Sequence, residues 1–306
     1  MQAGAASRHG TLTVRGNEIV GAAGEPVMLR GVSLFWSQWM PQFYNPAAIR
    51  WLRDDWHIDV VRAPLAVHRG GYLEHPEVEL RKIVNVIEAA IELGIYVIVD
   101  WHCHDPELPA AQKFFGWLAR EYHDCPNIIY EIWNEPLGKY TWEEVIRPHH
   151  ECVAAVIREY DARNLIIAGT PHWSHRVDIA GAAPLRIENV AYALHFYAGT
   201  NGAVLRDLAL RARRQPIALF VTEWGAGEAS GDGRFAARET LEWLAFLEEQ
   251  RISHVNWSIC DKIETCAALK PGVSGDGRWS QAELTASGSL VREHLAAMSL
   301  RAEPRT

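Results

Sequence analysis

Residues 127–136 read Asn-Ile-Ile-Tyr-Glu-Ile-Trp-Asn-Glu-Pro, an apolar run that ends in the tripeptide Asn134-Glu135-Pro136. A second run, residues 217–222 (Ile-Ala-Leu-Phe-Val-Thr), ends in the same way at Glu223. Short apolar runs with few polar breaks are typical of parallel strands that are covered on both faces. The sequence therefore predicts two carboxyl groups, each at the C-terminal end of a buried strand.

Six further runs of this kind complete a set of eight, with helical periodicity between them. The eight runs are Met28–Trp36, Val60–Leu65, Tyr96–His102, Ile128–Glu135, Leu165–Thr170, Val190–Tyr197, Ile217–Glu223 and His254–Lys262. The clearest helical patterns cover Pro76–Leu93, Trp142–Tyr160 and Arg234–Gln250. Eight strands that alternate with helices over about 250 residues predict an α/β fold, the (β/α)8 TIM barrel.

The start of the chain differs from this repeat. Polar residues with turn signals over Thr11–Val27 predict an N-terminal β-hairpin. The chain shows no linker, so we expect a single (β/α)8 catalytic domain over residues 11–298, with tails at residues 1–10 and 299–306. A doubly wound open sheet is the rival fold. Its nucleotide-binding form is disfavoured because no Gly-rich loop follows the first strand.

Composition excludes several classes of protein. The formal charge of −8 argues against a nucleic-acid-binding surface. The chain has no run of 18 apolar residues, which is the length that would predict a membrane span. Residues 1–10 show no apolar signal segment, so we expect a secreted protein whose signal peptide is absent or removed, while a cytoplasmic one stays open. Five cysteines are too few for a disulfide scaffold. Cys260 and Cys266 are close enough in sequence to pair, but the connectivity stays open.

Polar and aromatic residues gather at the predicted strand ends, where a barrel carries its active site. They are Trp36, Trp39, Arg62, His102, His104, Asn134, Glu135, Trp173, His195, Tyr197, Glu223, Trp257, Lys262 and Glu264. Paired carboxyl groups in such a position suit glycosidic bond cleavage, because one protonates the leaving oxygen while the other attacks the sugar or activates water. The 13 tryptophans fit this chemistry, since flat aromatic faces suit the apolar faces of sugar rings.

At these residues the chain resembles glycoside hydrolase family 5, the cellulase family, and within it the bacterial endo-β-1,4-glucanases. The segments that carry the resemblance are residues 31–37, 61–63, 95–102, 127–136, 195–200, 221–225 and 255–258. Two positions depart from many relatives: Phe35 stands where they carry His, and Ala66 where some place a substrate-facing Tyr.

The resemblance implies Glu135 as general acid/base and Glu223 as nucleophile of a retaining hydrolase. It implies a supporting role for Arg62, His102, Asn134, His195 and Tyr197. We expect burial and the charge of Glu223 to raise the pKa of Glu135, and hydrogen bonds and Arg62 to keep Glu223 ionised.

Residues of the cleft rim are expected to bind substrate, namely Trp39, Trp173, Trp257, Lys262 and Glu264. No cofactor is needed, because water is the second substrate. A metal at His102 and His104 is a weaker alternative, because the spacing lacks the usual zinc pattern. His104 is otherwise expected to be a rim residue.

The expected activity is endo-hydrolysis of β-1,4-glucan with retention, on cellulose and related β-glucans. The expected partner is the polysaccharide or a cello-oligosaccharide, with no nucleic acid or membrane partner and with the chain as a monomer. Another β-glycan, such as mannan, xyloglucan or mixed-linkage glucan, is the nearest alternative. A non-catalytic carbohydrate-binding barrel is the alternative from another class, although it needs neither carboxyl group.

Overall fold

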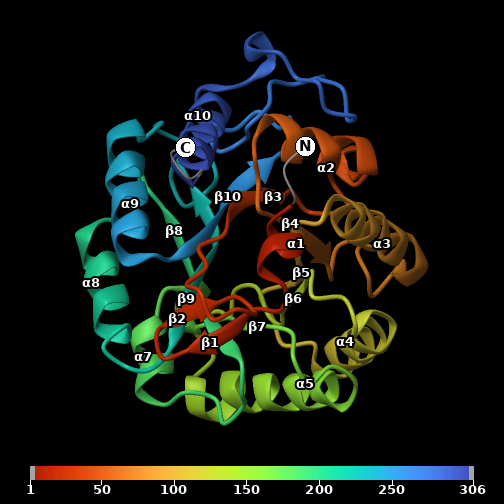
Figure 1. Ribbon diagram of the computed structural model, residues 1–306, viewed down its shortest axis with the longest axis vertical. Coiled ribbons are helices and arrows are strands. Elements are labelled where there is room, and N and C mark those ends of the chain that lie inside the picture. The colour runs from red at the N-terminus through yellow and green to blue at the C-terminus, as the bar shows by residue number, and fades with distance from the viewer. Residues whose placement is uncertain (1–3, 303–306) are drawn as a thin grey trace.

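Eight parallel strands form a closed barrel in the computed structural model, which describes residues 4–302 (Figure 1). The strands are β3 (Arg30–Leu34), β4 (Val60–Ala66), β5 (Tyr96–His102), β6 (Ile128–Glu131), β7 (Ile166–Ala168), β8 (Val190–Tyr197), β9 (Ala218–Gly225) and β10 (Ser253–Ile259). Going round the barrel, β10 lies between β9 and β3, and the other strands follow in chain order. Each strand coincides with one predicted apolar run, so the predicted TIM barrel is confirmed.

Helices surround the barrel and cover the outer face of the strands (Figure 1). They are α2 (Pro46–Asp55), α3 (Pro76–Leu93), α4 (Leu108–Tyr122), α5 (Arg147–Tyr160), α7 (Val177–Ala182), α8 (Ala203–Ala212), α9 (Ala237–Gln250) and α10 (Ala286–Ala302). The four-residue segment α6 (Pro171–Ser174) follows β7 and includes three residues with positive φ, His172, Trp173 and Ser174. Short 3-10 turns lie at η1 (Pro41–Phe43) and η3 (Gln281–Glu283), and a π-helical turn, η2 (Trp142–Ile146), precedes α5. The helix predicted at residues 142–160 is thus η2 followed by α5.

The predicted bounds of α3 agree with the structure at both ends. Pro76 occupies the first turn, where its missing N–H costs nothing. Gly94 closes the helix with φ of 67°, a left-handed conformation that glycine adopts without strain. By contrast, α9 begins three residues after the predicted Arg234, at Ala237.

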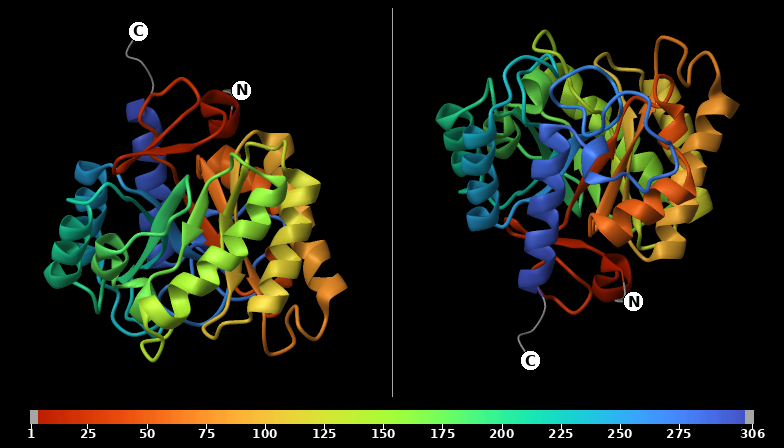
Figure 2. Two further views of the ribbon diagram at one scale, coloured as in Figure 1. Left: turned by 90° about the horizontal axis from the view of Figure 1, so that it is seen from below. Right: turned by 90° about the horizontal axis from the view of Figure 1, so that it is seen from above.

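The N-terminal segment closes the end of the barrel where the strands begin. Strands β1 (Thr13–Arg15) and β2 (Glu18–Val20) pair antiparallel, so the predicted hairpin is confirmed. The short helix α1 (Ala5–His9) precedes them, whereas residues 1–10 were expected to form a tail. In both views of Figure 2 this segment lies across one end of the barrel. Apolar side chains of α1 and of the hairpin pack against barrel residues near the strand starts. At the other terminus α10 continues to Ala302, past the predicted boundary at residue 298, and residues 303–306 lie outside the described part.

The inside of the barrel changes character along its axis. Near the strand starts it is apolar, with Ile98 and Ile129 in one cluster with the hairpin. Towards the strand ends it holds the buried ionisable side chains of Arg62, Asp100 and Glu131. Buried charges are costly unless they are paired, so a polar upper half indicates a functional region.

Two sequence expectations concern the chain as a whole. Among the described helices, none has the length and apolar character needed to cross a membrane. All five cysteines are free thiols, so Cys260 and Cys266 do not form a disulfide.

Candidate active site

A cleft opens where the strands end, on the face of the barrel away from the hairpin. Side chains from loops and strands that are far apart in the sequence line it. The lining includes Phe35, Trp36, Trp39, His102, His104, Asn134, Glu135, Tyr197, Glu223, Trp257, Lys262 and Glu264. Most of the residues predicted at strand ends are therefore brought together in one place.

Glu135 and Glu223 lie close together in this cleft. Glu135 follows β6 with its side chain 13% exposed, and Glu223 lies in β9 with its side chain 5% exposed. A carboxylate oxygen of Glu135 lies within 4.8 Å of one of Glu223. Retaining pairs of carboxyl groups are about 5–5.5 Å apart and inverting pairs about 6.5–9.5 Å. The arrangement therefore matches the closer spacing.

The backbone around Glu135 is held by neighbouring strands. Its N–H donates to the carbonyl oxygen of Cys103 at 3.3 Å, and the N–H of Asn134 donates to that of Trp101 at 3.1 Å. After β7 the chain passes so close that a Cβ at Gly169 would lie 2.0 Å from the carbonyl oxygen of Trp133. Glycine is needed there for this close approach, which fixes the segment that carries Glu135.

Glu223 receives one hydrogen bond on each carboxylate oxygen. The Tyr197 hydroxyl donates to Oε1 at 2.6 Å, and the Arg62 guanidinium donates to Oε2 at 3.2 Å. Burial raises the pKa of Glu223, and the negative charge of Glu135 raises it further. His195, Arg62 and the Tyr197 hydroxyl oppose this but do not cancel it. The expected contacts are thus present, although the pKa is shifted upward rather than downward.

Arg62 is completely buried beneath the carboxyl pair and binds several side chains at once. Its guanidinium lies 2.7 Å from Glu131, 2.9 Å from Asp100 and 3.2 Å from Glu223, and it donates to the Asn134 side-chain oxygen at 2.6 Å. Burial acts to lower the pKa of Arg62, but the three carboxylates outweigh it and raise the pKa. The guanidinium therefore stays charged and orients the polar floor of the cleft.

Both oxygens of Glu135 meet an imidazole ring. Nδ1 of His195 lies 2.9 Å from Oε1, and Nε2 of His104 lies 3.2 Å from Oε2. Burial acts to raise the pKa of Glu135, but the hydrogen bonds from His104 and His195 outweigh it and lower the pKa to about 2. The expectation of a raised pKa for Glu135 was therefore wrong, because it counted burial and Glu223 but neither imidazole.

A chain of side chains that sequence reasoning missed fixes the orientation of His195. The Thr222 hydroxyl donates to Glu131 at 2.6 Å, so its oxygen is left to accept from Nε2–H of His195 at 2.9 Å. Nδ1 of His195 therefore shares the mobile proton with Glu135. Burial acts to lower the pKa of His195, but the nearby carboxylates of Glu131, 3.7 Å from Nε2, and Glu135 outweigh it and raise the pKa to about 9.

His102, the last residue of β5, and His104, two residues later, contact different carboxyl groups. Nδ1 of His102 bonds the buried carboxylate of Asp100 at 2.6 Å, and its ring stacks on Trp257 with centroids 5.3 Å apart. Burial lowers the pKa of His102 well below its usual range, so the ring is neutral. His104 turns instead to Glu135, so it is more than a rim residue. The two rings bind different carboxylates, and they do not converge on one ion.

The cleft walls contain most of the predicted substrate-binding residues. Phe35 and Trp257 pack together with ring centroids 5.2 Å apart, and Trp39 is 46% exposed. Lys262 and Glu264 form an ion pair at 2.5 Å within the lining. Trp173 is the exception: it lies on α6, is 45% exposed and does not line the cleft.

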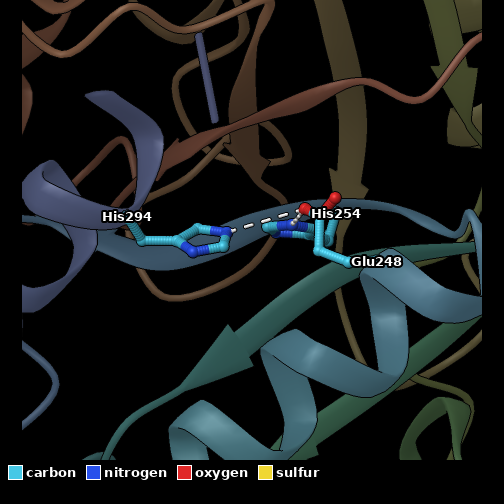
Figure 3. Close-up of side chains that lie close together, drawn as sticks. All are labelled: Glu248, His254 and His294. Carbon is cyan, nitrogen blue, oxygen red and sulfur yellow. Dashed lines mark ion pairs between the residues drawn. The ribbon is translucent and has the colours of Figure 1, made fainter. Parts of the chain in front are cut away.

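A second group of possible metal ligands lies outside the cleft. Glu248, His254 and His294 point toward one another from α9, β10 and α10 (Figure 3). Two features oppose a metal ion there. Arg30 already holds both oxygens of Glu248, at 2.7 and 2.6 Å. The indole N–H of Trp224 donates to Nδ1 of His254 at 3.2 Å, so the neutral ring carries its proton on Nε2, the nitrogen that an ion would need.

Comparisons with known proteins match the chain to one family and to several proteins named as endoglucanases. The family model "Cellulase (glycosyl hydrolase family 5)" matches residues 20–263. An endoglucanase of Clostridium saccharobutylicum is 40% identical over 96% of this chain and 67% of its own length. Endoglucanase A of Evansella cellulosilytica is 45% identical over 89% of this chain and 57% of its own length. The chain thus spans about three fifths to two thirds of these relatives.

Solved structures match over nearly the whole chain. One from Cytophaga hutchinsonii has 47% sequence identity and a TM-score of 0.96, and covers 97% of this chain and 98% of its own. The catalytic domain of Thermobifida fusca endoglucanase Cel5A has 31% identity and a TM-score of 0.92, over 96% of this chain and all of its own. A variant of that domain was solved in complex with cellotetraose. This chain therefore belongs to glycosyl hydrolase family 5, the cellulase family.

Proposed function

We propose that this protein is an endo-β-1,4-glucanase that hydrolyses internal β-1,4-glucosidic bonds with net retention. Glu223 is the nucleophile and Glu135 the general acid/base. The observation that carries this proposal is the pair of carboxylates with oxygens within 4.8 Å of each other at the strand ends of a family 5 barrel. This spacing suits direct attack by one carboxylate better than attack by an interposed water.

The first step forms a glycosyl-enzyme. A Glu223 oxygen attacks the anomeric carbon, while Glu135 gives its proton to the departing glycosidic oxygen. In the second step Glu135 takes a proton from water, and the resulting hydroxide oxygen displaces Glu223 from the anomeric carbon. The two inversions restore the β configuration, and the proton lost in the first step is regained in the second.

The proton that Glu135 donates is shared with His195. The lowered pKa of Glu135 and the raised pKa of His195 favour an ionised carboxylate and a proton on Nδ1 of the imidazole, across the 2.9 Å contact, before substrate binds. A bound glucan excludes water from the cleft, which disfavours the ionised carboxylate and moves the proton toward Glu135. The acid is thus supplied by a pair that holds one proton, and the pair titrates as a unit.

Arg62 and Tyr197 keep Glu223 ready to attack. Both donate to its oxygens, so the carboxylate group is held in position before substrate binds. Asn134 is itself held by Arg62 at 2.6 Å, with its side chain in the cleft lining. In this position its amide suits a hydrogen bond to the sugar 2-OH, which strengthens in the transition state.

The substrate class follows from the cleft walls. Trp257 and Trp39 offer flat apolar faces, which stack well on the all-equatorial glucose ring. Nothing in the lining is specialised for the axial 2-OH of mannose. The related Thermobifida fusca domain was solved with cellotetraose, which supports a glucan as partner. The polymer is too large to enter a cell, so we also propose that the protein acts outside the cell. We propose further that it is a monomer with a single catalytic domain.

Viscosity and reducing ends, measured together, test this function. Carboxymethylcellulose should lose viscosity early relative to reducing ends released, because an open cleft permits internal attack. It and barley mixed-linkage glucan should be cut much faster than mannan or xyloglucan, and Glu223→Gln should abolish turnover on all of them. Faster cleavage of mannan would refute the proposed substrate class. Binding of glucan without turnover would support a carbohydrate-binding barrel instead.

A further inference from the structure

The two oxygens of Glu135 lie in different surroundings. Oε1 meets the fully buried ring of His195, which the Thr222 and Glu131 side chains hold in place. Oε2 meets His104, whose side chain is 39% exposed and lines the cleft. The glycosidic oxygen must approach from the cleft, so His104 occupies the side of Glu135 where the substrate arrives.

His104 is held in this position by its neighbours. It lies two residues after the end of β5, and its ring centroid is 6.0 Å from that of Trp36. The charged or titratable groups that face it are the carboxylates of Glu135, Glu223 and Asp105 and the ring of His102. The hydrogen bond to Glu135 is the largest influence and raises the pKa of His104 against its burial. At acidic pH the imidazole ring of His104 is therefore positively charged.

We propose that His104 is a positioning residue whose positive charge keeps Glu135 ionised before substrate binds and so sets the lower pH limit of activity. The proposal rests on the proposed function of Glu135 as acid/base. A residue in the loop after β5 thus controls whether Glu135 carries a proton.

The contact between His104 and Glu135 has a different effect on each of the two catalytic steps. In the glycosyl-enzyme Glu135 must be a carboxylate in order to take a proton from water, and a donor on Oε2 stabilises that form. Before the first step the donor must yield, because Oε2 is needed by the leaving oxygen. His104 can yield because it is partly exposed and reaches Glu135 over 3.2 Å, a longer contact than that of His195.

The charge of His104 acts on the acidic limb of the pH profile. On that limb a proton binds to the Glu135–Glu223 pair and blocks the nucleophile. A charged His104 opposes this proton. Its replacement by a neutral side chain should raise the apparent pKa of the pair, so the acidic limb moves to higher pH. A hydrogen bond between charged partners is worth enough to expect a shift of about one pH unit.

Three variants test the proposal through kcat/KM on an activated aryl cellobioside. His104→Gln removes the charge but keeps an N–H donor, and its acidic limb should move up by about one unit. His104→Lys keeps a cation and should return the limb toward the wild-type position. His123→Gln is the matched control, because His123 is also exposed and also pairs with a carboxylate, Asp124 at 3.1 Å, but lies at the end of α4. Its limb should not move.

An independent readout separates this proposal from the proposed function. The carboxyl carbon of Glu135 can be followed by NMR in 13C-glutamate-labelled protein, with no substrate present. Its titration should move upward in His104→Gln even if the glucan activity proved wrong. An unmoved acidic limb and an unmoved Glu135 titration in a folded His104→Gln protein would overturn the proposal, as would a limb that Lys at this position fails to restore.

Discussion

Replacing Tyr197 by Phe should move the acidic limb of kcat/KM upward by roughly one to two pH units. The hydroxyl donates to Oε1 of Glu223 over 2.6 Å inside a buried site. A hydrogen bond to a charged group contributes about 1.5–3 kcal/mol, and one pKa unit corresponds to about 1.4 kcal/mol. The bond favours the ionised carboxylate, so its loss raises a pKa that burial and the charge of Glu135 already raise. A larger fraction of the enzyme is then protonated on its nucleophile at mildly acidic pH.

The assay is the pH dependence of kcat/KM on an activated aryl cellobioside, where leaving-group protonation contributes little. Tyr122→Phe is the matched control, because its hydroxyl also donates to a carboxylate, Glu88 at 2.8 Å, but away from the cleft. The control profile should coincide with that of the wild type. If Tyr197→Phe lowered the plateau without moving the limb, the hydroxyl would only place the nucleophile, and the electrostatic reasoning would be refuted.

Three further predictions concern the acid and the role of ions. Glu135→Gln should slow substrates with poor leaving groups far more than activated aryl glycosides, and equal losses on both would show that Glu135 is not the acid. The alkaline limb of kcat/KM should lie near the raised pKa of His195, about 9, because the shared proton is lost there; a limb in the range of an isolated carboxylic acid would contradict the shared proton. Chelators should leave the initial rate unchanged, since protein donors already occupy both oxygens of Glu135 and of Glu223. Activity lost in EDTA and restored by one divalent ion would show that a step needs that ion.

The barrel could be predicted from the sequence because its strands are unbroken apolar runs between turn residues. Pro76 and Gly94 mark both ends of α3, so that helix could be delimited as well. The five-residue helix α1 was missed because so short a segment has no measurable periodicity. It is stabilised by burial of Ala5 and Ala6 against the rest of the fold, which no local pattern reveals.

The catalytic pair could also be predicted, but its electrostatic surroundings could not. Glu131 and Asp100 stand as charged residues inside apolar runs, a signal that was available and that points to a buried ion pair. The contact between His104 and Glu135 depends on how the loop after β5 turns, which the spacing of the residues does not encode. For the same reason Trp173 was expected in the cleft, although α6 places it outside the lining.

The anomeric configuration of the first product tests the central claim most directly. Hydrolysis of a cello-oligosaccharide can be followed by proton NMR before mutarotation mixes the anomers. Attack by Glu223 followed by attack of water should release the β anomer first, as the close spacing of the two carboxylates predicts. Release of the α anomer first would show a single displacement by water and would contradict the assignment of Glu223 as nucleophile.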